Sequence, residues 1–233
     1  LDDQFYQQWC KQAGSASVTT FSKNNTEADF YASDITLLSA GLTSFVLHAP
    51  SDTVAISLSV LGEHNVMNAL AAGAAAVAAG ASLADVKKGL EKVQPVNGRL
   101  KAFSNHGQTI IDDTYNASPG SMKAAIDVLA GFAGARCLIM GTMGELGEMA
   151  VSGHKEVAEY AKEKGIEQLV VVGEYADHVA QTFGKGCVTY NDMNELLPVV
   201  NNIKAAALLI KGSRSARMER AVEALLANKG RQQ

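Results

Sequence analysis

From residue 98 onward, short apolar segments alternate with longer segments of helical periodicity, and this alternation limits the possible folds more than any other feature. Strands that alternate with helices form a parallel sheet covered by helices. The right-handed crossover rule makes this a doubly wound, Rossmann-like sheet, so we predict an α/β fold. The predicted strands are 108–111, 136–140, 168–172, 187–190 and 206–210, and the predicted helices are 119–130, 152–164, 175–183, 192–202 and 215–227, with Pro198 weakening the fourth.

The first 97 residues follow a different pattern, in which strand-like segments come first and helices follow. We predict an amphipathic helix over 1–12, strands over 18–21, 30–37, 44–48 and 54–60 with a turn at Ala40-Gly41, and helices over 69–79 and 83–92. Pro, Asn and Gly then cluster in Gln94-Pro95-Val96-Asn97-Gly98-Arg99, between a helix and a new strand. We therefore predict two domains, residues 1–97 and 98–233.

Composition excludes several classes of partner. A net charge of -4 and a pI near 5.7 provide no basic surface for nucleic acid or for an anionic membrane. The apolar run 69–81 is too short and too rich in alanine to span a bilayer, and the acidic start 1–4 does not resemble a signal peptide. Three widely spaced cysteines, Cys10, Cys137 and Cys187, indicate reduced thiols in a cytosolic protein without a catalytic cysteine.

A polar segment, Asp112 to Ser121, lies between the apolar run 109–111 and a helical pattern. Its two carboxylates follow a predicted strand directly, at the edge where open parallel sheets bind ligands. Ser118 suits a helix N-cap and Pro119 the first helical position. Asp and Asn are also ordinary turn residues, and this simpler interpretation is preferred when the segment is considered alone.

Two more motifs follow predicted strands and are expected at the same edge. Lys211-Gly212-Ser213-Arg214-Ser215 offers two cations and two hydroxyls at a helix start, which suits a carboxylate or a phosphate, although simple capping beside a solvated basic turn is the alternative. The Gly-rich loop 141–147 lacks the glycine spacing of dinucleotide-binding proteins, which disfavours a nicotinamide enzyme. We expect His154 at a surface helix position rather than in contact with this loop.

The segment Gly62-Glu63-His64-Asn65-Val66-Met67-Asn68 leads into the predicted helix 69–79. Asn65 and Asn68 are three residues apart, so in a first helical turn they share a face, where their amides could bind a base or a sugar. The alternative is that Asn65 caps the helix and His64 lies on the surface. The segment alone does not decide between the two.

Five blocks in this order resemble the ADP-forming Mur ligases of peptidoglycan synthesis: 62–69, Gly98-Arg99, 112–122, 141–147 and 211–215. The Tyr-Asn-Ala block and the Glu-Leu-Gly loop are most similar to the member that adds D-alanyl-D-alanine to UDP-N-acetylmuramoyl-tripeptide. The Asp-Asn-Pro-Arg motif of the diaminopimelate-adding relative is absent from the chain.

The resemblance implies a mechanism and a set of roles. The tripeptide carboxylate would attack the γ-phosphate of ATP, with Mg2+ as cofactor, and the dipeptide amine would then displace phosphate from the acyl phosphate. Asn65 and Asn68 would hold the adenosine, Arg99 would approach the phosphates and Asp113 would accept hydrogen bonds from the ribose. The dipeptide pocket would be lined by Tyr115, Asn116, Lys211, Ser213 and Arg214.

The chain also departs from the family, because it contains no P-loop, no Mg2+-ligating Glu and His, and no carbamylated Lys at the family's positions. We therefore expect a fragment that is inactive alone, in which residues 1–97 are the strand-plus-helix second half of the central ATPase domain. No catalytic residue or metal ligand is assigned, and a cytoplasmic monomer is expected. The alternatives are another ligase of the superfamily, such as the diaminopimelate- or lysine-adding enzyme, a folylpolyglutamate synthase or a cyanophycin synthetase, and a non-catalytic nucleotide-binding module.

Overall fold

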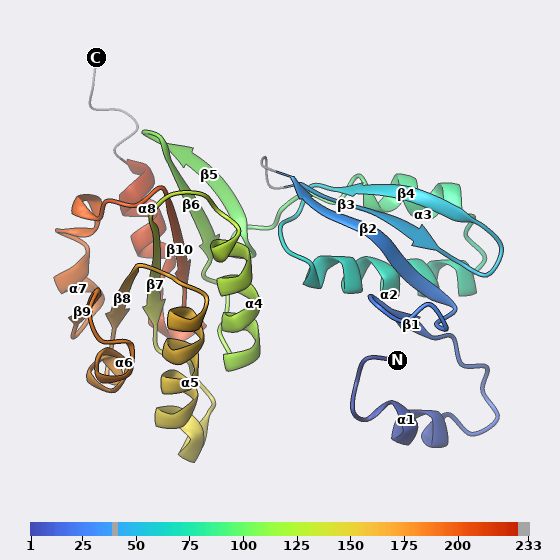
Figure 1. Cartoon of the computed structure of the whole chain (residues 1–233), viewed down its shortest axis with the longest axis horizontal. Helices are drawn as coiled ribbons and strands as arrows, with labels where there is room; N and C mark the ends of the chain where they lie inside the picture. The colour runs from blue at the N-terminus through green and yellow to red at the C-terminus, as the bar shows by residue number, and fades with distance from the viewer. Residues whose placement is uncertain (39–41, 228–233) are drawn as a thin grey trace. The chain divides into compact units, whose positions relative to one another are not determined.

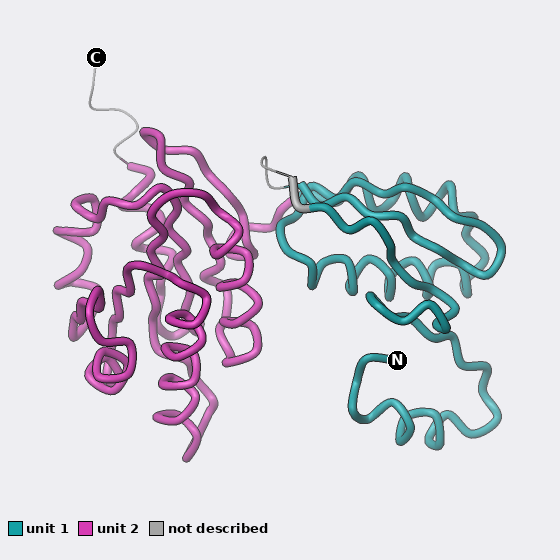
Figure 2. Tube along the Cα trace, viewed as in Figure 1, with its two compact units in different colours: residues 1–94 teal, residues 95–233 magenta. Residues whose placement is uncertain are grey.

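The computed structural model describes residues 1–38 and 42–227, and these form two compact units (Figures 1 and 2). The first unit is Leu1–Gln94 and the second is Pro95–Gln233, so the division lies within the Pro-Asn-Gly cluster. The predicted turn at Ala40-Gly41 lies outside the described residues. None of the helices described is long and apolar enough to cross a membrane.

The first unit is a four-stranded sheet covered by helices (Figure 1). Its strands are β1 (Phe21–Ser22), β2 (Phe30–Leu38), β3 (Leu42–His48) and β4 (Thr53–Leu58), in that order, with β1 parallel to β2 and the other pairs antiparallel. Its helices are α1 (Tyr6–Ala13), α2 (His64–Ala78) and α3 (Leu83–Leu90). Every second residue of β3 is buried, as expected for a sheet with one covered face, and Phe45 and Leu47 share a core with residues of α2 and α3.

Three elements in this unit begin three or more residues away from their predicted starts. Helix α2 begins at His64, five residues before the predicted start, so the polar motif is itself helical. The predicted strand 18–21 is almost entirely absent, because the Asp29 carboxylate accepts hydrogen bonds from both the backbone N–H and the hydroxyl of Thr20. Helix α1 begins at Tyr6 and buries none of its residues.

The second unit is built on a six-stranded sheet of order β5-β6-β10-β7-β8-β9, which confirms the predicted α/β architecture. Strands β6 to β10 are parallel, whereas β5 pairs with β6 in the antiparallel direction. The strands are β5 (Lys101–Asn105), β6 (Gln108–Asp113), β7 (Arg136–Gly141), β8 (Gln168–Val172), β9 (Cys187–Tyr190) and β10 (Ala207–Lys211). The last strand in the sequence therefore lies in the middle of the sheet.

Helices cover both faces of this sheet, so the central strands are apolar on both sides (Figure 1). The helices are α4 (Pro119–Ala130), α5 (Ala150–Glu163), α6 (Ala176–Phe183), α7 (Met193–Leu196) and α8 (Glu219–Ala227), with short 3-10 turns η1 (Gly147–Met149), η2 (Val200–Asn202) and η3 (Arg214–Ala216). Ser118 caps α4 through a reciprocal pair with Ser121, and Pro119 begins the helix, as predicted.

The predictions that fail here fail for local reasons. Strand β5 was not predicted, because it is an edge strand of mainly polar sequence in which only Asn105 is buried. The predicted helix 192–202 is split into α7 and η2, since Pro198 lacks an N–H and disfavours helical backbone before it. The predicted helix 215–227 begins only at Glu219, because Arg217 adopts a left-handed conformation with φ of 49°.

Candidate functional site

Three of the sequence motifs lie at one edge of the second unit's sheet. Strands β6, β10 and β7 are neighbours and run parallel, so the loops that follow them open at the same carboxyl edge. These loops are 114–118 after β6, 142–146 after β7 and 212–213 after β10. The motifs after the three strands are thus brought together, as the alternation of strands and helices predicted.

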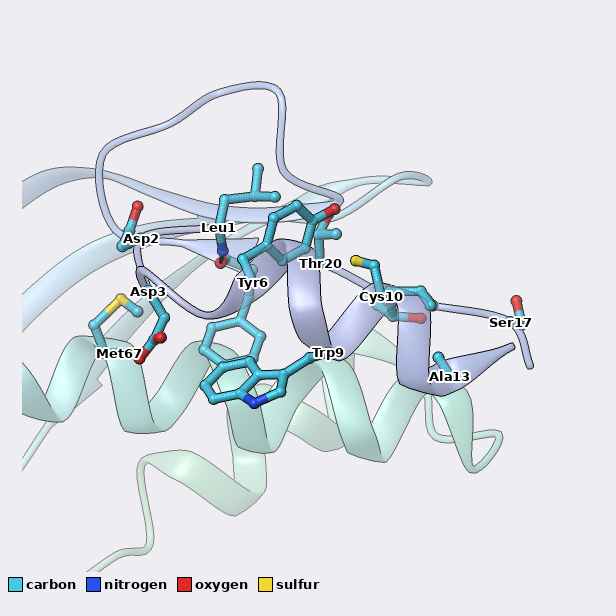
Figure 3. A pocket seen from close by; sticks show the side chains of 13 residues that line it. Leu1, Asp2, Asp3, Tyr6, Trp9, Cys10, Ala13, Ser17, Thr20 and Met67 are labelled. Atoms are coloured by element: carbon cyan, nitrogen blue, oxygen red, sulfur yellow. Dashed lines mark hydrogen bonds between the residues drawn. The ribbon is translucent and has the colours of Figure 1, made fainter. Parts of the chain in front are cut away.

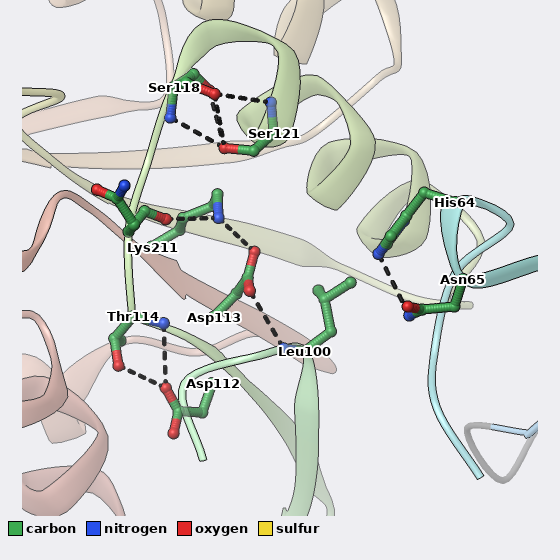
Figure 4. A network of polar contacts seen from close by, with 10 residues as sticks. His64, Asn65, Leu100, Asp112, Asp113, Thr114, Ser118, Ser121 and Lys211 are labelled. Carbon is green, nitrogen blue, oxygen red and sulfur yellow. Dashed lines mark hydrogen bonds and ion pairs between the residues drawn. The ribbon is translucent and has the colours of Figure 1, made fainter. Parts of the chain in front are cut away.

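A buried ion pair connects two of these strand ends (Figure 4). Lys211 and Asp113 are direct partners in the register of β10 and β6, and the Lys211 Nζ donates to the Asp113 Oδ2 at 2.6 Å. The same Nζ donates to the carbonyl of Asn116 at 2.8 Å, and the second carboxylate oxygen accepts the N–H of Leu100 at 3.2 Å. Lys211 is 3% and Asp113 9% exposed, so removing either partner would leave a charge without its counterion inside the protein.

The neighbouring Asp112 organises backbone rather than facing a ligand. Its carboxylate accepts hydrogen bonds from the N–H and hydroxyl of Thr114 and from the N–H of Gly98. The Gly98 carbonyl in turn accepts the N–H of Tyr115. Gly98 has φ of 75°, and a Cβ there would lie 3.1 Å from the Tyr115 nitrogen, so the position requires glycine.

The side chains of Arg99 and Tyr115 lie against each other on the surface of the second unit. The Arg99 guanidinium carbon is 4.2 Å from the centre of the Tyr115 ring, which is a cation–π contact. Tyr115 is 51% exposed and Arg99 is exposed as well. Residues predicted to contact different substrates, the nucleotide and the dipeptide, are therefore neighbours.

The Gly-rich loop after β7 is held by His154, which is buried and not at the surface as predicted. Its Nε2 accepts the N–H of Met143 at 2.9 Å, and its Nδ1 lies 2.6 Å from the carbonyl of Ala150, to which it donates. The carbonyl of Thr142 accepts the N–H of Ser213 at 2.9 Å, so this loop is also bonded to the loop after β10. Burial lowers the pKa of His154 and favours the neutral ring, although Ala150 and the charge of Glu174 oppose this effect.

Two glycines at these strand ends have a packing role. A Cβ added at Gly141 would lie 2.5 Å from the Met218 sulfur, and one added at Gly212 would lie 2.6 Å from the Met218 Cγ. Met218 is completely buried and passes over both positions. The glycines thus admit the Met218 side chain, which explains their presence without a bound phosphate.

The loop after β10 does not begin an α-helix, which corrects the prediction of a helix start at Ser215. Ser213 is buried, and its hydroxyl lies 2.9 Å from that of Ser215. Arg214 begins the 3-10 turn η3 and is exposed, with its guanidinium 3.7 Å from the Glu219 carboxylate. The cationic and hydroxyl groups are present as predicted, but α8 begins too late to place its N-terminus among them.

In the first unit, Asn65 and Asn68 share a face of α2, as predicted. The Asn68 amide donates to the Asn65 side-chain oxygen at 3.1 Å, and the Asn65 amide donates to the carbonyl of Leu61 at 2.7 Å. The alternative that Asn65 caps the helix is wrong, because Glu63 occupies the N-cap position and makes no side-chain capping bond. Asn68 is exposed, so its amide is accessible to a ligand.

A mainly apolar cavity of about 640 Å³ lies in the first unit (Figure 3). It is lined by α1 and the segment leading to β1, with Tyr6, Trp9, Cys10 and Phe21 among its walls. Met67 of the polar motif also lines it, but neither Asn65 nor Asn68 is among the described residues of its wall. The cavity is therefore not the predicted nucleotide contact.

The residues that the structure describes do not fit a Mg2+ site. Within 1–38 and 42–227, no group of three or more His, Cys, Asp or Glu side chains could hold a metal ion. The oxygens of Asp112 and Asp113 accept the hydrogen bonds described above, and no third carboxylate or imidazole of the described residues joins them as a metal ligand. No metal-dependent step is assigned to this chain.

The cysteines carry no nucleophilic chemistry in the second unit. Burial raises the pKa of the Cys137 thiol to about 12 and that of Cys187 to about 11, so neither forms a thiolate near neutral pH. Cys10, Cys137 and Cys187 are free cysteines.

Sequence reasoning missed the partners of the site residues rather than the residues themselves. The Asp113–Lys211 pair could have been inferred from the neighbouring strand ends, but only if β10 were known to lie beside β6. The contact of His154 with Met143 has no comparable signal, because a histidine in the second turn of an amphipathic helix reads equally well as exposed.

Comparisons with protein families match most of the chain. The model of the Mur ligase middle domain matches residues 1–76, and that of the Mur ligase glutamate ligase domain matches residues 98–214. The UDP-N-acetylmuramoyl-tripeptide–D-alanyl-D-alanine ligase of Escherichia coli K12 is 38% identical over 97% of this chain and 51% of that protein. Its namesake from Haemophilus influenzae is 37% identical over 93% of this chain and 48% of that protein. The chain spans about half the length of the curated relatives it matches.

Solved structures of Mur ligases superpose on this chain. A crystal structure of MurF from Acinetobacter baumannii superposes with a TM-score of 0.87 at 33% identity, covering 97% of this chain and 50% of that one. The MurF ligase of Thermotoga maritima, solved in complex with ADP, has a TM-score of 0.78 at 24% identity over 94% of this chain and 51% of that one, which shows the fold alone.

Proposed function

The chain belongs to the Mur ligase family, and from this premise we propose that it supplies part of an ATP-dependent ligase that adds D-alanyl-D-alanine to UDP-N-acetylmuramoyl-tripeptide. The observation that carries the proposal is the 38% identity, over nearly the whole chain, to a ligase named for this reaction. The clustering of the motifs at one sheet edge of the second unit is consistent with it. The product would be a precursor of peptidoglycan.

Each unit has its own proposed role. Residues 1–97 would belong to the ATP-binding domain, and residues 98–233 would form the C-terminal ligase domain. In the first unit, Asn65 and the exposed Asn68 would contact adenosine. In the second, Arg99 would contact the nucleotide phosphates and Asp113 the ribose. Each Asp113 oxygen already accepts one hydrogen bond, and a carboxylate oxygen can accept a second, so this role is compatible with the ion pair.

The dipeptide would be bound beside the buried ion pair. Lys211 is held by Asp113 and by the Asn116 carbonyl, which leaves one of its three N–H donors for a substrate oxygen. Arg214 is exposed and cationic, which suits the dipeptide carboxylate. Tyr115, Asn116 and Ser213 would complete the pocket, with the Tyr115 ring as an exposed apolar surface.

The reaction would proceed in two steps. The tripeptide carboxylate attacks the γ-phosphate of ATP, releasing ADP and leaving an acyl phosphate. The dipeptide amine then attacks the acyl carbon, and phosphate leaves as the amide forms. ATP would arrive as its Mg2+ complex, and no residue of the described chain is assigned to the metal. Fixed cations such as Lys211 would stabilise negative charge that develops during transfer.

The test is phosphate release from Mg-ATP with UDP-N-acetylmuramoyl-tripeptide and D-alanyl-D-alanine. It should be made on this chain and on a form extended to the length of its relatives. We expect release only from the extended form, because the chain contains no P-loop sequence. Release by the chain alone would contradict the proposed division of roles.

Exchanging the amino substrate separates the alternatives. Faster turnover with diaminopimelate, lysine or glutamate than with D-alanyl-D-alanine would identify another ligase of the superfamily. Nucleotide binding without turnover in the extended form would instead identify a non-catalytic module. A cytoplasmic location and a monomeric state belong to the same proposal, and light scattering coupled to gel filtration tests the second.

A further inference from the structure

His154 has no role in the site proposed above, yet it is 1% exposed and both of its ring nitrogens are bonded. Nε2 accepts the N–H of Met143, and Nδ1 donates to the carbonyl of Ala150 one turn earlier in α5. A backbone N–H can only donate, so Nε2 must carry no proton and the ring must be neutral. The Tyr175 ring packs on it with centroids 4.4 Å apart, which fixes its plane.

The bond to Met143 extends into the proposed dipeptide pocket. Met143 is buried, and the preceding carbonyl, of Thr142, accepts the N–H of Ser213. The backbone of Gly144 also lies near Ser213, since a Cβ added at Gly144 would be 3.6 Å from the Ser213 Cβ. Ser213 lies two residues from Lys211 in the loop after β10. His154 is therefore connected, through the backbone of Thr142 and Met143, to Ser213 of the proposed dipeptide pocket.

We propose that His154 is a positioning residue, whose neutral ring holds the loop after β7 against Ser213 and thereby sets the affinity of the second unit for the incoming dipeptide. This inference rests on the proposed function only for the identity of the ligand. The anchoring of the loop is a property of the chain itself and can be tested separately.

Three variants separate anchoring from general stability. His154→Leu removes the acceptor and leaves the Met143 N–H unbonded in the interior. His154→Gln supplies an amide oxygen with a reach similar to that of Nε2, so it should restore the bond. His178→Leu makes the same change at an exposed position of α6 and is the matched control.

The first measurement is hydrogen exchange of the Met143 and Ser213 amides in this chain without substrate. We expect both amides to exchange roughly tenfold faster in His154→Leu, and at wild-type rates in His154→Gln and His178→Leu. Amides in the middle of β8 serve as an internal reference for global unfolding. Faster exchange in β8 together with the loop, or unchanged exchange at Ser213 in His154→Leu, would overturn the anchoring.

The second measurement is steady-state ligation in the extended form. In His154→Leu we expect the KM for D-alanyl-D-alanine to rise roughly tenfold, with kcat and the KM for ATP within about twofold of wild type. His154→Gln should restore the dipeptide KM. An unchanged dipeptide KM in His154→Leu, or equal increases for both substrates, would overturn the positioning role. If wild type forms no product with D-alanyl-D-alanine, the proposed function fails, and the exchange measurement alone decides the anchoring.

Discussion

At the scale of single residues, the second unit contains a buried ion pair between Lys211 and Asp113. Lys211 and Asp113 form a short ion pair, and the remaining bonds of both side chains go to backbone groups. A buried pair of this kind contributes little stability relative to apolar residues, but breaking it is costly. Its presence in place of two apolar side chains therefore favours a functional explanation.

Lys211→Met should lower the free energy of unfolding of the second unit by roughly 3–5 kcal/mol, because the Asp113 carboxylate is left unpaired. The double variant Lys211→Met/Asp113→Leu should recover most of this loss while ligation by the extended form stays abolished. Urea unfolding followed by circular dichroism measures the first effect, and product formation the second. A double variant as unstable as the single one would contradict the pairing, and one that ligates normally would remove both residues from the site.

His154 makes stability depend on pH. Its folded pKa lies below the ordinary value of 6.5, so as pH falls the unfolded state binds the proton first. Its contribution is complete above about pH 6.5 and is lost as pH falls from there through the folded pKa. Burial lowers this pKa, while the hydrogen bond to the Ala150 carbonyl and the charge of Glu174 oppose the shift, and the Tyr175 ring packs on the imidazole. Thermal melts of wild type and His154→Gln between about pH 7.5 and 5 should diverge at the acid end, with wild type losing more. Parallel curves would show that folding does not lower the pKa of His154.

At the scale of elements, the predicted strands agree with the structure where a strand is buried on both faces and its sequence is therefore mainly apolar. Strands β7, β8 and β10 each contain an apolar run of four residues and β6 contains Ile110 and Ile111, and the positions of all four strands were predicted within one or two residues. The predictions fail where a single side chain or backbone angle sets the boundary of an element, as with Asp29 at the predicted strand 18–21 and Arg217 before α8.

The motif residues could be predicted because their types are chemically informative. Their partners could not, because the sheet order that places β10 beside β6 is not encoded in any local pattern.

The turn at Gly98 offers a test of close packing. Gly98 and Gly107 both have positive φ, of 75° and 79°, but only at Gly98 would a Cβ meet another atom, the backbone of Tyr115. Gly107→Ala should therefore cost about 1–2 kcal/mol from backbone strain alone, and Gly98→Ala clearly more. Urea unfolding of the two variants provides the comparison. Equal costs would mean that the Tyr115 backbone moves aside freely.

At the scale of the whole molecule, each unit has a hydrophobic core of its own. The core of the first unit joins β2, β3 and β4 to α2 and α3. In the second unit, one face of the sheet packs on α7 and α8. The chain nevertheless spans only about half the length of its curated relatives, so these two cores are the part of such a ligase that this sequence accounts for.

The order of the strands in the second unit also has a consequence for biosynthesis. Strand β10 pairs with β6 on one side and β7 on the other, yet it follows every other described strand of this sheet in the sequence. Until Ala207–Lys211 has been made, β6 and β7 have no strand between them, and the backbone N–H and C=O groups that face β10 in the sheet stay unpaired. Chains that end near residue 203 should therefore be sensitive to protease throughout the second unit, whereas chains that end near 227 should resist it. The β6–β10–β7 arrangement thus delays completion of the proposed dipeptide site until β10 has been made, so that a chain cut short before β10 lacks the Lys211–Asp113 pair.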